Sequence, residues 1–189
     1  MYRESISKDE LAELPLQQFE GEIFLIDNEA DYYAAVDFLS REKVLGFDTE
    51  TKPSFKKGQV NQVALLQLAT RDKAFLFRLN QTGLENGIRG ILQNPNIKKI
   101  GVAIRDDIKT LQRLSHFKPA GFIELQEHVK SYGIQDFGLK KMTAIILGFR
   151  ISKSQRLSNW EAPELTEAQQ IYAATDAWVS YMIYQSLNN

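Results

Sequence analysis

Cysteine is absent from this chain of 189 residues, and histidine occurs only twice, at positions 116 and 128. The absence of thiols excludes disulfides, thiolate zinc sites, iron–sulfur clusters and a cysteine nucleophile within this chain. Two histidines are too few for a nitrogen-rich metal site. Any metal bound here must therefore be held mainly by oxygen ligands, which favours magnesium, manganese or calcium.

The chain also lacks an excess of positive charge. Lysine and arginine number 23, aspartate and glutamate number 24, and the formal net charge is −1. A protein that holds nucleic acid by attraction over its whole surface would show a clear basic excess. Nucleic acid is still compatible with this composition if a local basic rim and bound cations supply the positive field.

Long hydrophobic runs, low-complexity tracts, internal repeats and linker-like stretches are missing as well. The first ten residues are polar and carry no apolar signal core, so the sequence predicts no membrane segment and a cytoplasmic location. A hydrophobic content of 43%, with 11% aromatic residues, is enough for a packed core. We expect a single domain over 1–189, with residues 1–20 as an N-terminal extension packed on it.

The pattern of apolar residues predicts strands and helices in a definite order. Strands are expected at 22–26, 43–50, 62–70, 73–78, 97–103 and 121–125. Helices are expected at 29–40, 82–93, 105–115 and 139–147, with a last long helix after 166. In the first of these helices Tyr33 and Val36 recur at helical spacing. Three successive strands followed by alternating helices and strands indicate an α/β fold around a mixed sheet.

Two carboxylates end the apolar strand at 43–50. Asp48 and Glu50 are two residues apart, so on a strand they point to the same face. Two charges that close repel each other by a few kcal/mol, on the order of 4 at an effective dielectric of 20. The simple alternative is a solvated pair at a strand end. Because the preceding run is apolar and no arginine lies adjacent, we favour a bound cation between them.

Two further acidic groups lie far away in sequence. Asp107, in the first turn of the helix at 105–115, shares a face with Leu111, whereas Asp106 is better placed to cap the helix. Tyr172 and Asp176 are four residues apart on the last helix and therefore lie on one face. Each feature alone has an ordinary structural explanation, namely interaction with the helix dipole for Asp107 and packing for the Tyr–Asp pair.

Taken together, these segments resemble a known family. LGFDTE at 45–50, GVAIRDD at 101–107 and YAATDA at 172–177 are similar to the three motifs of the DEDD 3′–5′ exonucleases. The tyrosine identifies the DEDDy subgroup, which includes ribonuclease D and the Werner-syndrome helicase exonuclease domain. The resemblance extends to VALLQL at 63–68 and LSNW at 157–160, and it covers about 21–187.

The resemblance implies a ribonuclease H-like mixed β-sheet flanked by helices and a site for two divalent metal ions, Mg²⁺ or Mn²⁺. It implies that Asp48, Glu50 and Asp176 hold one ion, that Asp48 also holds the other, and that Asp107 supports the site directly or through water. Tyr172 would orient the attacking water. A related subgroup has histidine five residues before the last aspartate, where this chain has Ile171.

Substrate contacts are expected from two polar loops and two aromatic residues. The candidates are Lys52, Phe55, Lys56 and Lys57 after the acid pair, and Arg156 and Trp160 before the last helix. The basic residues would hold backbone phosphates, and the aromatic rings would stack on a terminal base. The alternatives are solvated lysines and, for Trp160, packing as a lid where the helix begins.

The leading hypothesis is a metal-dependent exonuclease that releases nucleoside 5′-monophosphates from the 3′ end of DNA or RNA. The 3′ polarity comes from the resemblance alone, and no residue can be assigned to the 2′-hydroxyl contact that separates RNA from DNA. The other hypotheses are a catalytically silent nucleic-acid-binding module and a phosphodiesterase of very short oligonucleotides. No helicase motifs are present, so any helicase or repair partner would be a separate chain. The sequence gives no oligomeric state.

Overall fold

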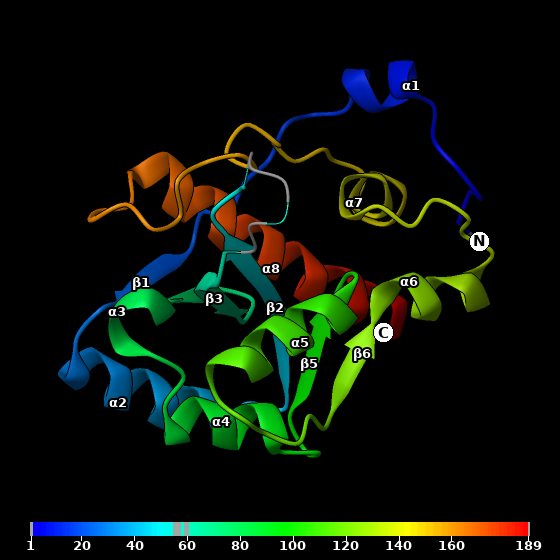
Figure 1. Ribbon diagram of the computed structural model, residues 1–189. Helices are drawn as coiled ribbons and strands as arrows, with labels where there is room; N and C mark the ends of the chain where they lie inside the picture. The colour runs from blue at the N-terminus through cyan, green and yellow to red at the C-terminus, as the bar shows by residue number, and fades with distance from the viewer. Residues whose placement is uncertain (1, 55–57, 59–60, 189) are drawn as a thin grey trace.

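The computed structural model describes residues 2–54, 58 and 61–188, and these form a six-stranded mixed sheet in the order β1-β4-β3-β2-β5-β6 (Figure 1). The central strands β2, β3 and β4 are antiparallel, whereas β1 runs parallel to β4, and β5 and β6 continue parallel to β2. The strands are β1 (Glu22–Ile26), β2 (Val44–Thr51), β3 (Val63–Ala69), β4 (Lys73–Arg78), β5 (Lys98–Gly101) and β6 (Phe122–Glu124). The predicted α/β class and mixed sheet are confirmed.

Helices cover both faces of the sheet. One face packs against α2, α4 and α5, and the long helix α8 covers the other along β2, β3 and β4 (Figure 1). The helices are α1 (Lys8–Glu13), α2 (Glu29–Leu39), α3 (Leu79–Thr82), α4 (Asn86–Gln93), α5 (Ile104–Leu114), α6 (Leu125–His128), α7 (Leu139–Leu147) and α8 (Glu167–Asn188), with a 3₁₀ turn η1 at Val129–Tyr132. None of the helices in the described part of the chain is long and apolar enough to cross a membrane.

Three local expectations were wrong. The helix expected at 82–93 begins only at Asn86, as α4, and a separate short helix, α3, ends at Thr82, because Gly83 has φ +70°, which a continuous helix does not allow. Helix α6 and η1 were not predicted at all. On α2 the apolar face begins one residue earlier than expected: Tyr32 is buried, whereas Tyr33 is 58% exposed. The Tyr32 hydroxyl accepts a hydrogen bond from the backbone N–H of Ile88 (3.0 Å), which anchors α2 to α4.

Helix α8 lies unusually close to β2. A Cβ atom on Gly46 would lie 1.9 Å from the carbonyl oxygen of Ala177, so only glycine fits at this point. Small residues on the helix, Ala173, Ala174 and Ala177, are all fully buried against the same face of the sheet. This close approach brings the middle of α8 beside the end of β2, where the acid pair lies.

The N-terminal residues run across this helix. Leu16 forms a β-bridge with Arg150, and the N–H of Gln17 donates to the Arg150 carbonyl (2.9 Å). The N–H of Phe19 then donates to Thr175 Oγ1 on α8 (3.0 Å). The segment before β1 is therefore hydrogen-bonded to α8 and to the loop that precedes it.

A buried lysine ties the sheet to α4. Lys99 is fully buried, and its ammonium donates to the carbonyls of Ile91, Asn94 and Ile97 at 2.7–2.9 Å. We expect Lys99→Met to lower the free energy of unfolding by about 2–4 kcal/mol, because it leaves buried carbonyls without a donor. Urea unfolding beside the exposed-site control Lys43→Met would measure this. Equal stability of the two variants would contradict it.

Candidate active site

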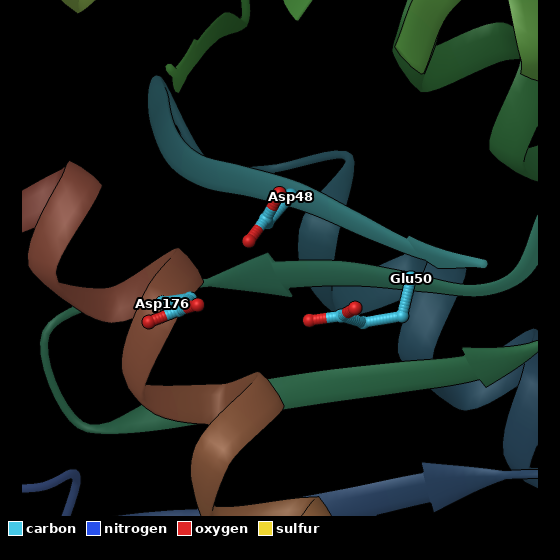
Figure 2. A group of neighbouring side chains, drawn as sticks. All are labelled: Asp48, Glu50 and Asp176. Carbon is cyan, nitrogen blue, oxygen red and sulfur yellow. The ribbon is translucent and has the colours of Figure 1, made fainter. Parts of the chain in front are cut away.

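Three carboxylates from two elements meet on the α8 face of the sheet. Asp48 and Glu50 come from the end of β2 and Asp176 from the middle of α8, and Figure 2 shows their carboxyl groups pointing toward one another. Each offers a ligand oxygen, and these oxygens all lie within 4.8 Å of one another. The resemblance to the DEDD exonucleases had implied that these three acids lie together.

Burial and mutual repulsion make this group unstable as three anions. Burial, followed by the charges of Asp176 and Asp107, raises the pKa of Asp48 well above its usual range. Burial and the same kind of repulsion raise the pKa of Glu50 to about 10, and burial raises that of Asp176 to about 6. Among the described residues no salt bridge reaches any of the three.

The chemistry of this group fits divalent metal ions. One oxygen of Asp176, Oδ1, is buried and has no hydrogen-bond partner within the described chain. A cation between the carboxylates would neutralise their repulsion and give that oxygen a ligand role. Magnesium and manganese are the natural candidates for an all-oxygen donor set.

Asp107 lies next to this group but on the other side of β2. Its Oδ1 accepts a hydrogen bond of 2.6 Å from the Thr49 hydroxyl, and Thr49 faces away from Asp48 because side chains alternate along a strand. Burial raises the pKa of Asp107 to about 6. The side chain is therefore outside the three-carboxylate group, although its charge acts on both Asp48 and Glu50.

Helix α5, which carries Asp107, is held at its first turn by an acid from β6. The two oxygens of Glu124 accept hydrogen bonds from the N–H groups of Ala103 (3.0 Å) and Ile104 (2.9 Å). Ala103 has φ +57°, an uncommon left-handed conformation for a residue with a side chain. Glu124 thus orients the start of α5. The exposed Asp106 pairs instead with Lys109 (3.1 Å).

Tyr172 is a buried neutral phenol beside the acids. Burial, then the charges of Asp176, Glu50 and Asp48, raises its pKa above the ordinary value near 10. A phenol with a raised pKa is a poor base but a good hydrogen-bond donor. This geometry suits a group that positions a water molecule.

Trp160 requires a correction. Its side chain is 0% exposed and packs on Tyr172, with ring centroids 6.0 Å apart. A fully buried indole cannot offer a face to a terminal base, so the packing alternative describes Trp160 and the stacking role does not. Its position beside Tyr172 makes it a support for that ring.

The other predicted substrate contacts are only partly placed. Lys52 pairs with Glu161 at 3.4 Å, and Arg156 is exposed. Phe55, Lys56 and Lys57 lie outside the described residues. Among the described residues, Lys153 is the basic residue whose charge lowers the pKa of Asp48, Glu50 and Asp176. The sequence had pointed to the polar loop before the last helix through Arg156, but a loop gives no signal for which of its basic side chains turns toward the site.

The comparison with known families decides the identity of the chain. Residues 23–189 match the model of a 3′–5′ exonuclease domain. The chain belongs to the 3′–5′ exonuclease family. It is 35% identical over 186 residues to the mouse bifunctional 3′–5′ exonuclease/ATP-dependent helicase WRN, an alignment that covers 93% of this chain and 13% of that protein.

Other members of this exonuclease family show the same fold and similar sequence. The ribonuclease D of Gluconacetobacter diazotrophicus is 30% identical over 165 residues, which are 86% of this chain and 42% of that protein. The chain therefore spans less than half the length of either curated relative. The crystal structure of the Aedes aegypti Nibbler EXO domain has a TM-score of 0.81 at 24% identity and covers 91% of each chain, which shows the shared ribonuclease H-like fold.

Proposed function

We propose that this exonuclease domain hydrolyses phosphodiester bonds at the 3′ end of DNA or RNA and releases nucleoside 5′-monophosphates, with two divalent metal ions. The observation that carries the proposal is the convergence of Asp48, Glu50 and Asp176 within 4.8 Å. Family membership supports the reaction and its polarity. The raised pKa values support a cation site, because they express the free-energy cost of crowding these anions without one.

Each side chain has a role in this proposal. Asp48, Glu50 and Asp176 would hold one ion, Asp48 would contribute to the second, and Asp107 would act directly or through water. Bound Mg²⁺ or Mn²⁺ would supply Lewis-acid stabilisation of the phosphate and a lowered water pKa. Tyr172, in its neutral form, would donate a hydrogen bond that orients the attacking water. With this role for Tyr172, the chain would belong to the tyrosine subgroup.

The direct test is degradation of 5′-labelled strands. Single strands and recessed duplexes incubated with magnesium or manganese should give a ladder that shortens from the 3′ end. Nucleoside 5′-monophosphates should accumulate. If neither metal yields a ladder at high protein concentration, the proposal fails. DNA and RNA strands of equal sequence, compared in parallel, identify the substrate class.

Lys153 is the described basic residue best placed to hold a substrate phosphate. Its charge acts on all three carboxylates, and its side chain is exposed. We expect Lys153→Gln to weaken binding of a single strand about five- to tenfold and to reduce the slope of log K against log salt by about 0.7. Fluorescence anisotropy over a salt series would measure both quantities.

The control for this variant is Lys118→Gln, which removes an equally exposed lysine from the loop after α5. Equal salt slopes for the two variants would show that Lys153 makes no phosphate contact.

Two expectations from the sequence, the cytoplasmic location and a separate helicase or repair partner, stay predictions.

A further inference from the structure

Gln67 occupies a place on β3 that links it to the acids. In the antiparallel register of β2 and β3 it stands directly opposite Asp48, just as Leu65 stands opposite Glu50. Side chains opposite each other in such a pair point to the same face, with Cβ atoms about 4.5–5.5 Å apart. Gln67 therefore projects toward α8, beside the Asp48 carboxylate.

Gln67 is a fully buried polar side chain in an apolar part of the core. It is 0% exposed, and its neighbours on the same face of β3, Leu65 and Ala69, are apolar. Within the described residues neither its Nε2 nor its Oε1 has a hydrogen-bond partner. A buried amide without partners costs about 1–3 kcal/mol for each unsatisfied group, whereas a methionine of similar size would carry no such penalty. Packing alone therefore does not account for an amide here.

An unsatisfied acceptor on the same face of the sheet belongs to the three-carboxylate group. Asp176 Oδ1 is buried and likewise has no partner within the described residues, and the Asp176 carboxylate lies within 4.8 Å of the Asp48 carboxylate that faces Gln67. An amide N–H₂ donates two hydrogen bonds, and a carboxylate oxygen accepts them. The strand register and the carboxylate group therefore bring an unsatisfied donor and an unsatisfied acceptor to the same face of the sheet.

We infer that Gln67 is a positioning residue, whose side-chain amide donates to the Asp176 carboxylate and holds it in the orientation that binds metal. This inference rests on the proposed metal site. A hydrogen bond restricts the rotation of a ligating carboxylate, and each carboxylate oxygen has a second lone pair that stays available to the ion. Loss of such a partner typically lowers metal affinity or activity about 10- to 100-fold. Gln67 itself touches neither substrate nor metal.

The test compares Gln67→Met with Leu66→Met, which alters the adjacent, equally buried residue on the opposite face of the same strand. Titration of each protein with Mn²⁺ alone, followed by electron paramagnetic resonance, gives the affinity without any substrate. We expect Gln67→Met to bind Mn²⁺ about tenfold more weakly, with kcat lowered by about the same factor and KM for a single strand nearly unchanged. Leu66→Met should match the wild type in all three.

Each outcome is decisive. Equal Mn²⁺ affinity of Gln67→Met and the wild type, in a variant that folds, overturns the role of Gln67 but leaves the proposed exonuclease intact. A wild type that binds no Mn²⁺ overturns both. If Gln67→Met does not fold, NMR of the Gln67 side-chain amide in the wild type tests the inference instead. The Gln67 side-chain amide should be protected from exchange and should shift on addition of Mg²⁺, and an amide that exchanges freely and does not shift would contradict the inference.

Discussion

Asp48→Asn is expected to lower the rate of strand degradation by about 1,000-fold or more while the fold survives. Asp48 is the proposed ligand of both ions, and Lewis-acid stabilisation of a phosphoryl transition state amounts to several kcal/mol. Since each 1.4 kcal/mol or so changes a rate tenfold, the loss of about 4 kcal/mol gives that factor. The single-turnover rate of 3′-end removal, with saturating Mg²⁺, measures the effect.

The same variant should be more stable than the wild type in the absence of metal. Its amide cannot ionise, which removes the part of the repulsion that Asp48 adds to burial in raising the pKa of Glu50. A gain of about 1 kcal/mol would raise the melting temperature of a domain of this size by about 2–4 °C. Thermal unfolding in the presence of a chelator records it, and loss of activity without this gain would indicate damage to the fold.

Asp106→Asn is the matched control, because Asp106 is an exposed acid that pairs with Lys109 outside the site. It should retain wild-type activity and wild-type stability without metal. Full activity in Asp48→Asn, or an equal loss in Asp106→Asn, would contradict the assignment of the site.

The two pairs of acidic-site residues were recognisable because their spacing leaves a local trace, whereas the meeting of the pairs was implied by the family resemblance. The two-residue spacing of Asp48 and Glu50 after an apolar run, and the four-residue spacing of Tyr172 and Asp176, each place two groups on one face. The order of strands and helices along the chain followed from periodicity, and capping boxes at Ser7 and at Thr166 mark the starts of α1 and α8. These features depend on residues a few positions apart, which is the range over which sequence reasoning works.

What the sequence did not predict depends on contacts between distant elements. Gln67 reads as one polar residue in an apolar strand until the register with β2 places it opposite Asp48. Glu124 caps α5 only because β6 ends beside that helix. Trp160 was expected to contact the substrate. Its burial against Tyr172 depends on how the preceding loop folds over α8, which no local pattern shows. Tertiary packing determines all three.

Metal dependence of stability gives the second large effect, and its sign follows from the pKa shifts. The folded-state pKa of Glu50, about 10, and those of Asp107 and Asp176, about 6, lie above the ordinary values of 4.5 and 3.8. The folded protein without metal therefore holds more protons than the unfolded chain. The stability that these groups contribute is fully present below about pH 4 and is lost as the pH rises through the folded values.

Magnesium should reverse this trend, because ions bind the deprotonated carboxylates and must displace their protons. We expect the melting temperature without metal to fall from about pH 5 to about pH 9, and the increase caused by Mg²⁺ to grow over the same range. Calorimetric titration with Mg²⁺ near pH 7 in buffers of different ionisation enthalpy should show release of about one proton or more per molecule. In Asp48→Asn both the proton release and the pH-dependent stabilisation should be much smaller. If Mg²⁺ raises the melting temperature by the same amount at every pH in this range, the three carboxylates are not the metal site, whatever activity the protein has.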